Sequence, residues 1–263
     1  MSERPDPLYV ASVAKAFSVL EAFSHTLSDL SLSEISDLTG LDKSASQRFA
    51  HTLWRLGYLE KDERTRRFRL GKPVLDLGFS YLRASRMVEL ATPALVDLRN
   101  KCGERANLSL YDDTTLIYVI RQQSRREYFD GSLVGRRIPV FCTAGGRAVL
   151  AQLPEQEARA VIARSDLQAR TPRTLVDPTL IMREVRKAAE RGYGMAVEET
   201  TLGEITVGAA VTDATGRPIA AVHIAASTSD WTPDAFAQRC APLAMETAQT
   251  LSRAQRPAGP RVR

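Results

Sequence analysis

The chain is poor in cysteine and histidine. Its 263 residues include three of each, and Cys102, Cys142 and Cys240 lie far apart without a C-x-x-C pair. This spacing excludes a disulfide framework and a zinc site built from paired ligands. Isolated thiols fit a reducing compartment, so we expect a cytoplasmic protein with no metal.

Long apolar runs are also missing. The N-terminal MSERPDPLYV lacks the apolar core of a signal peptide, and no stretch reaches the roughly 18 apolar residues that a membrane span needs. We therefore expect no membrane partner. The sequence contains no G-x-S-x-G, H-E-x-x-H, P-loop or Rossmann motif. These absences favour a protein that is not an enzyme and that carries no cofactor.

The composition is that of a globular protein with a mild basic excess. Hydrophobic residues make up 44%, charged residues 25%, and the net charge is +5. The length suits two domains. Residues 43–72 hold nine basic and three acidic side chains, a net of +6, whereas the first 42 residues hold two basic and seven acidic ones. This local contrast indicates a polyanionic partner such as DNA.

The positive segment follows the pattern of a helix-turn-helix. After a helix expected from Val10 to Phe23, Ser31 and Glu34 form a capping box, which starts a short helix. Gly40 suits the left-handed position that ends this helix. The next helix begins near Asp42 and ends at Gly57, and its apolar face is expected to consist of Ala45, Phe49, Leu53 and Leu56.

A basic hairpin follows this pair of helices. Tyr58–Lys61 and Arg67–Leu70 have strand-like alternation, and the polar residues 62–65 between them suit a turn. A hairpin at this position is a wing, so residues 9–71 are predicted to form a winged helix-turn-helix domain.

The polar front of the second helix is the predicted DNA-reading surface, because recognition helices present their first turns to base edges. Glutamine pairs with adenine and arginine with guanine, so we assign base contacts to Gln47 and Arg48. His51 either contacts a base or packs against the wing. The full predicted set is Lys43, Ser44, Ser46, Gln47, Arg48, His51, Arg55, Arg64, Arg66 and Arg67. Taken alone, the polar helix face or the basic hairpin could simply be a solvent-exposed surface. Both features in this order favour DNA binding.

Beyond Gly71 a helix from Pro73 to Arg86 leads into alternating strand-like and helical runs, which predict an α+β fold on an antiparallel sheet. The expected strands are 106–111, 116–121, 194–198, 207–212 and 219–225. The expected helices are 87–102, 146–152, 155–163, 178–191 and 233–253.

Several motifs occur in a characteristic order: ASVAKAFSVLEAF, LSLSEISDLTGLDKSASQRFAHTLWRLGYLEKDERTRRFRLG, VGRRIPVFCTAGGRAVLAQLP, TPRTLVDP, RGYGMAVEE and GRPIAAVHIAAS. With them the chain resembles the IclR family of bacterial transcriptional regulators over residues 10–253. The resemblance implies a winged helix-turn-helix (9–71) on a palindromic double-stranded DNA operator, a linker helix (72–86) and a GAF-like domain (87–254). That last domain is expected to bind a small organic-acid effector and to assemble a homodimer or a dimer of dimers.

By the same resemblance, the effector site consists of Thr143, Ala144, Gly145, Ala196, Thr206, His223 and Ala225. Backbone N–H groups of Ala144 and Gly145 at a helix N-terminus suit a carboxylate. His223 either donates to the effector or is a hydrogen-bonded core histidine. Gly203–Thr206 and Ala196 depart from the family pattern toward less polar residues, which suggests a less polar pocket and an aromatic or larger acid. The direction of Arg121, Arg136 and Arg137 stays open.

Two other functions remain as alternatives. The α+β domain would be enzymatic if Cys142 were a nucleophile and His223 its base, although packing is the simpler role for a cysteine between Phe141 and Thr143. A non-specific nucleic-acid architectural protein would not need a second domain of this size.

Overall fold

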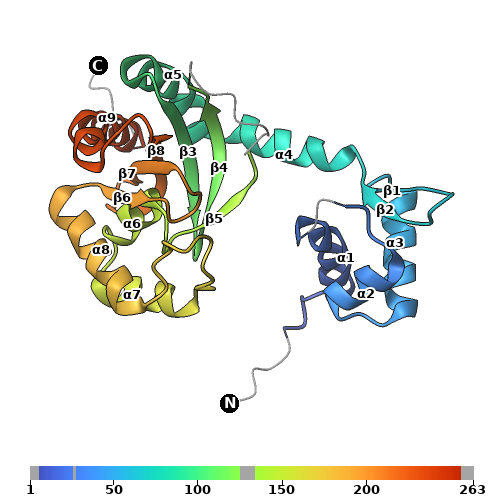
Figure 1. Ribbon diagram of the computed structural model, residues 1–263. Coiled ribbons are helices and arrows are strands. Elements are labelled where there is room, and N and C mark those ends of the chain that lie inside the picture. The colour runs from blue at the N-terminus through green and yellow to red at the C-terminus, as the bar shows by residue number, and fades with distance from the viewer. Residues whose placement is uncertain (1–5, 26–27, 125–133, 256–263) are drawn as a thin grey trace. The chain divides into compact units, whose positions relative to one another are not determined.

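The computed structural model describes residues 6–25, 28–124 and 134–255 (Figure 1). The chain divides into two compact units, Met1–Tyr81 and Leu82–Arg263.

The smaller unit begins with three α-helices. They are α1 (Ala11–Glu21), continued by the 3-10 turn η1 (Ala22–His25), then α2 (Leu32–Thr39) and α3 (Lys43–Arg55). The predicted capping box is confirmed, because Glu34 N donates to Ser31 Oγ while Ser31 N donates to a Glu34 carboxylate oxygen at 2.7 Å. Gly40 adopts φ 68°, the left-handed conformation that the short turn between α2 and α3 requires.

The predicted hairpin is also confirmed. Strands β1 (Leu59–Lys61) and β2 (Phe68–Leu70) pair antiparallel, and Leu30 adds a bridge to Phe68 that the sequence pattern did not indicate. The core beneath the hairpin includes Val19, Ile35, Ala50, Leu53 and Leu59. Helix α4 (Pro73–Ala84) follows.

The apolar face of α3 is rotated from the expected one. The buried residues are Ser46, Ala50 and Leu53, at the i, i+4, i+7 spacing of one helix face, whereas Leu56 is 62% exposed. Ala45 and Phe49 are only partly buried. The expected stripe is therefore confirmed at Leu53 and in part at Phe49, which packs against the core, and it is wrong at Leu56.

The larger unit contains the predicted antiparallel sheet, in the order β5-β4-β3-β8-β7-β6. Its strands are β3 (Arg105–Asp112), β4 (Thr115–Gln122), β5 (Arg137–Pro139), β6 (Gly194–Val197), β7 (Glu204–Thr212) and β8 (Pro218–Ser227). The three-residue edge strand β5 was not predicted; such a short run carries no usable periodicity.

Helices cover both faces of this sheet (Figure 1). Helices α5 (Arg86–Cys102) and α9 (Pro233–Ala254) pack on one face, against even-numbered residues of β8 such as Val222 and Ile224. Helices α6 (Ala144–Leu150), α7 (Glu155–Arg164) and α8 (Pro178–Arg191) belong to the other face. Odd-numbered residues of β3 and β8 point to this second side, where the polar side chains gather.

Candidate functional site

The exposed front of α3 gathers most of the predicted DNA-reading residues. Asp42 caps the helix by accepting from Ala45 N at 2.8 Å, which fixes where its first turn begins. Six predicted side chains are exposed on this helix, namely Lys43, Ser44, Gln47, Arg48, His51 and Arg55.

Ser46 does not belong to this surface. Its side chain is 0% exposed, and its hydroxyl oxygen finds no hydrogen-bond partner within the described part of the chain. The prediction that Ser46 contacts DNA is therefore wrong, because position 46 faces the interior of the unit.

The hairpin presents two of its three predicted arginines to solvent. Asp62 Oδ1 accepts from the backbone N–H groups of Arg64 and Thr65, and Arg66 takes a positive φ of 59°, so the tip is a tight turn with Arg64 and Arg66 exposed. The ring centroids of His51 and Trp54 lie 5.4 Å apart, and Nζ of Lys61, on β1, lies 5.7 Å from the centroid of the Trp54 ring. His51 is thus exposed and in contact with Trp54 at once.

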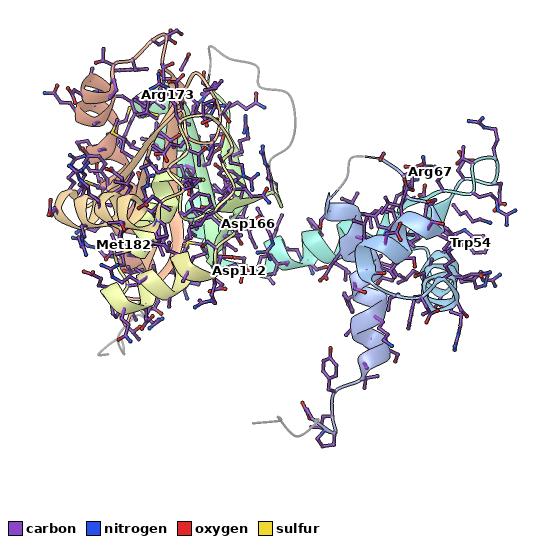
Figure 2. The ribbon with its side chains drawn as sticks, turned by 60° about the horizontal axis from the view of Figure 1, so that its bottom comes forward. Trp54, Arg67, Asp112, Asp166, Arg173 and Met182 are labelled. Atoms are coloured by element: carbon purple, nitrogen blue, oxygen red, sulfur yellow. The ribbon has the colours of Figure 1, made fainter. Side chains whose placement is uncertain are left out.

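Arg67 has a structural role that was not predicted. Its guanidinium donates to the Asp29 carbonyl at 2.7 Å and to Glu34 at 2.6 Å, which fastens the hairpin to the N-terminus of α2. The hydrogen bonds with the backbone and side chain of Ser31, and after them the one from Arg67, lower the pKa of the Glu34 carboxyl to about 2. Arg67 and Trp54 can be located in the smaller unit in Figure 2.

The larger unit contains a cavity of about 140 Å³ on the second face of the sheet. Six of the seven predicted effector residues line it, namely Thr143, Ala144, Ala196, Thr206, His223 and Ala225. The seventh, Gly145, packs against His223, because a Cβ at position 145 would lie 2.1 Å from the imidazole ring.

Strand register explains why these residues meet. Asn107 on β3 pairs with Arg121 on β4 and with His223 on β8, so the three side chains form one row across adjacent strands. A second row contains Arg105, Ala225, Thr206 and Ala196, one from each of β3, β8, β7 and β6. Both rows face the cavity.

Glycines bring α6 down onto the sheet beside these rows. A Cβ at Gly208 would lie 2.6 Å from Gly145 N, and one at Gly194 would lie 2.1 Å from the Ala144 carbonyl oxygen. Only glycine allows the first turn of α6 to approach this closely, so the turn forms one wall of the cavity.

The cavity is more polar than we expected. Among the described lining residues are three guanidinium groups, from Arg105, Arg121 and Arg136, and one carboxylate, that of Glu204, which pairs with Arg105. Burial, and after it the charge of Arg105, lowers the pKa of Arg121. The prediction of a less polar pocket considered only β6, β7 and β8, whereas the cations come from β3, β4 and residue 136.

Sequence patterns did not identify Arg105, Asn107 or Tyr118. Arg105 and Asn107 alternate with the buried Ala106 and Leu108 along β3, which is a signal of one polar face, but the pairing that aims them at His223 is not readable from spacing. Arg137 does not line the cavity; it donates to Asp112 Oδ2 at 2.5 Å.

His223 is buried and held without charge. Burial lowers its pKa to about 4, and Nε2 lies 2.6 Å from Ser109 Oγ, so it has the hydrogen bond expected of a core histidine while still lining the cavity. The Tyr118 ring lies 5.6 Å away, and burial raises the pKa of its phenol to about 12. The cavity therefore offers one neutral imidazole and one neutral phenol.

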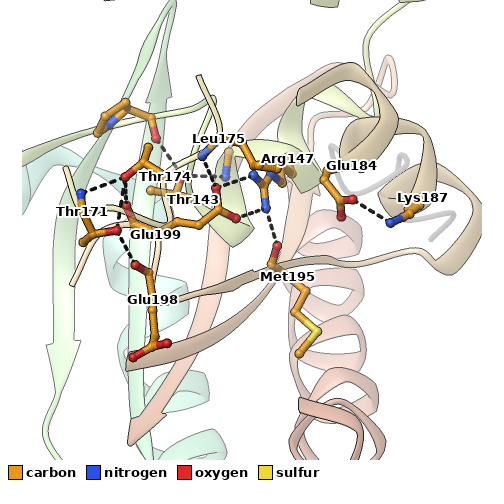
Figure 3. Close-up of polar contacts among 12 residues, drawn as sticks. Thr143, Arg147, Thr171, Thr174, Leu175, Glu184, Lys187, Met195, Glu198 and Glu199 are labelled. Atoms are coloured by element: carbon orange, nitrogen blue, oxygen red, sulfur yellow. Dashed lines mark hydrogen bonds and ion pairs between the residues drawn. The ribbon is translucent and has the colours of Figure 1, made fainter. Parts of the chain in front are cut away.

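A buried ion pair holds the loop that carries Thr200 and Thr201 into the cavity wall (Figure 3). Arg147 of α6 donates from Nη1 and Nη2 to the two Glu199 oxygens, at 2.6 and 2.8 Å, and from Nη1 to the Met195 carbonyl. Thr174 Oγ1 donates to the Glu199 carbonyl at 2.6 Å. The wall is thus tied to α6 and to the segment before α8.

Cys142 has the environment of a packed thiol. It is fully buried, and burial raises its pKa to about 12. A nucleophilic cysteine needs a lowered pKa, so this environment gives the enzymatic alternative no support. Within residues 6–25, 28–124 and 134–255 there is no cluster of three metal-ligating side chains, and no helix there is long and apolar enough to cross a membrane.

A basic helix-turn-helix unit joined to a unit with a buried, cation-lined cavity defines the class of ligand-controlled DNA-binding regulators. Comparison with known families agrees. Residues 12–63 match the IclR helix-turn-helix domain, and residues 79–253 match the family described as bacterial transcriptional regulator IclR C-terminal. The chain belongs to the IclR family of transcriptional regulators.

Individual relatives are similar over nearly their whole length. The Pca regulon regulatory protein of Pseudomonas putida is 30% identical over 247 residues, covering 94% of this chain and 84% of that protein. The p-hydroxybenzoate hydroxylase transcriptional activator of Acinetobacter baylyi is 27% identical, covering 92% and 91%. The crystal structure of an IclR transcriptional regulator from Alicyclobacillus acidocaldarius superposes with a TM-score of 0.81 at 25% identity, covering 94% and 100%.

Proposed function

We propose that this regulator is controlled by a small aromatic carboxylic acid that binds in the cavity of the larger unit. The observation that carries the proposal is the excess of cations among the described lining residues, three guanidinium groups against one carboxylate. Arginine forks match carboxylate oxygens geometrically, and a buried excess of positive charge favours an anionic ligand.

The size and lining of the cavity favour a single ring. The cavity measures about 140 Å³, close to the roughly 150 Å³ that holds benzene in a protein interior, so its size argues against a ligand of more than one ring. The aromatic rings of Tyr118 and His223, 5.6 Å apart between centroids, line the cavity together with the cations. The name of the Acinetobacter relative, an activator for p-hydroxybenzoate hydroxylase, also connects an aromatic acid with this family. The carboxylate is assigned to the arginines and not to α6, whose seven residues make a weak dipole.

On DNA, we assign base reading to Gln47 and Arg48, with His51 beside them. The other exposed cations and hydroxyls, from Lys43, Ser44, Arg55, Arg64 and Arg66, are assigned to phosphates. Arg67 supports these contacts by holding the hairpin. In this proposal residues 9–71 read the DNA and residues 72–86 form the linker helix. Residues 87–254 bind the effector and assemble the oligomer. A regulator of this kind acts on DNA in the cytoplasm and performs no catalysis.

A second copy of the chain is proposed to cover an apolar groove of the smaller unit. The groove is lined by Ala16, Phe17, Leu20, Leu53, Leu56, Tyr58 and Leu77. Phe17, Leu56 and Leu77 are each more than half exposed, which is unusual for a lone surface. A two-fold pair of reading heads would match the two halves of a palindromic operator; a dimer of such dimers is the larger assembly proposed.

The effector proposal is tested by isothermal titration of the full-length protein with benzoates and with two- and three-carbon acids. We expect saturable binding of a benzoate and a change in affinity for an operator fragment, measured at fixed salt. Arg121→Gln should weaken the binding of all acids. Binding of the short acids alone would reject the aromatic assignment.

A further inference from the structure

Two polar atoms in the row of Arg121, Asn107 and His223 have no hydrogen-bond partner among the described residues. Asn107 Oδ1 and Arg121 Nε are buried without a hydrogen bond in the described part of the chain, and both residues line the cavity. Asn107 is only 4% exposed, so solvent does not readily compensate its carbonyl oxygen. An unsatisfied buried acceptor carries a desolvation penalty, which a hydrogen-bond donor on a ligand would remove.

Two of the neighbouring side chains already have partners. Nε2 of His223 lies at hydrogen-bond distance from Ser109, and Arg105 pairs with Glu204. Asn107 lies directly opposite Arg121 in the strand register. One ligand could therefore contact both the acceptor, Asn107 Oδ1, and the donor, Arg121 Nε. Ser46 and Arg147 also hold an unpaired buried atom, but neither lines the cavity.

We infer that Asn107 is a specificity-determining residue, which selects acids that carry a hydroxyl or another hydrogen-bond donor. Arg121 Nε–H donates to the ligand carboxylate, and the ligand O–H donates to Asn107 Oδ1. The ligand class is then a single-ring hydroxy-carboxylic acid. This inference rests on the proposed acid effector and adds the polarity of the ligand's second group.

The test compares matched ligands by isothermal titration of the full-length protein. The three hydroxybenzoate isomers are each paired with the fluorobenzoate of the same substitution, since fluorine is close in size to a hydroxyl but donates no proton. We expect at least one hydroxyl isomer to bind about tenfold or more tightly than its fluoro partner, because the donor satisfies a buried acceptor.

Two variants assign this preference to position 107. Asn107→Leu, which is similar in volume and has no acceptor, should bind the hydroxyl and fluoro partners within about twofold of each other. Asn107→Asp keeps only acceptors, so it should retain the preference while binding every acid more weakly through charge repulsion. Thermal unfolding of each variant checks the fold; if the leucine variant is unfolded, the wild-type ligand pairs and the aspartate variant still decide.

The outcomes distinguish the role inferred for Asn107 from the proposal that an aromatic acid is the effector. If no benzoate binds, the effector proposal fails. If benzoates bind but wild type treats every pair alike, or if Asn107→Leu keeps the hydroxyl preference, only the role of Asn107 fails. Loss of the preference in Asn107→Asp also overturns it, since that result would mean that the amide donates to the ligand.

Discussion

At the residue scale, His223 is a titratable group buried in its neutral form. Burial lowers its pKa from 6.5 to about 4. Below pH 6.5 the imidazole takes up a proton in the unfolded chain but stays neutral in the folded chain. The contribution of His223 to the free energy of unfolding is therefore fully present above pH 6.5 and is lost as the pH falls toward about 4.

We therefore predict an acid-sensitive stability with a defined cause. The loss attributable to His223 should approach about 3 kcal/mol near pH 4. Urea unfolding between pH 7 and pH 4.5 should show a falling free energy in wild type and a much flatter one in His223→Gln. An equal slope in both proteins would mean that another group is responsible. Glu34, whose pKa is lowered to about 2, acts in a more acidic window and does not interfere.

Arg48 and Arg66 are both exposed arginines in the DNA-reading unit, but their positions differ. Arg48 is in the early turns of α3, whereas Arg66 is at the hairpin tip. We predict that Arg48→Ala weakens operator binding by about 1–3 kcal/mol and binding to random DNA far less, because a base contact is lost. Arg66→Ala is the matched control and should weaken both about equally. Fluorescence anisotropy at fixed salt measures all four affinities; equal losses for Arg48→Ala would place its side chain on a phosphate.

At the scale of elements, the Arg147–Glu199 pair joins α6 to the strand end that supports the cavity wall (Figure 3). Both side chains are at least nine-tenths buried. Removing one partner leaves the other charge buried and unpaired, whereas replacing both with apolar residues leaves no charge in the interior.

The double substitution is therefore expected to be milder than either single one. Arg147→Met should destabilise the larger unit by about 3–5 kcal/mol, and combining it with Glu199→Leu should recover much of that loss. Chemical unfolding of the three variants provides the measurement. As a control, Arg159→Met breaks the exposed pair with Glu155 and should cost under about 1 kcal/mol. A double variant as unstable as the sum of its singles would show that the pair contributes packing alone.

Helices whose ends are set by neighbouring residues in the sequence could be predicted. The Ser31–Glu34 capping box and the helix Pro178–Arg191, which is capped by Asp177 and ended by Gly192, occur as expected. The rotation of α3 could not be predicted, because packing against α2 and α1 decides which of two adjacent faces is buried. The row of Arg121, Asn107 and His223 depends on pairing between distant strands, so spacing alone could not bring these side chains together.

At the scale of the whole molecule, effector and operator must influence each other equally. If the acid changes operator affinity by some factor, the operator changes acid affinity by the same factor. The sign of that change decides whether the acid releases or recruits the regulator. Asn107 and Arg48 lie in different units, so substitutions at these positions are expected to alter the two binding steps separately and to leave the coupling factor intact.

The proposed assembly through the apolar groove gives the last prediction. Phe17→Asp places a charge where a second copy would pack, so the smaller unit should lose its partner. Operator affinity should then fall by about 10²–10⁴, because two linked half-site contacts become independent ones, while each reading head keeps its fold. Sedimentation velocity and operator titration of the full-length protein measure both effects. Leu180→Asp, at a comparably exposed leucine of α8, is the control and should change neither. A Phe17→Asp protein with unchanged mass and unchanged operator affinity would exclude this groove as the contact between copies, because an aspartate cannot be buried there without a measurable penalty.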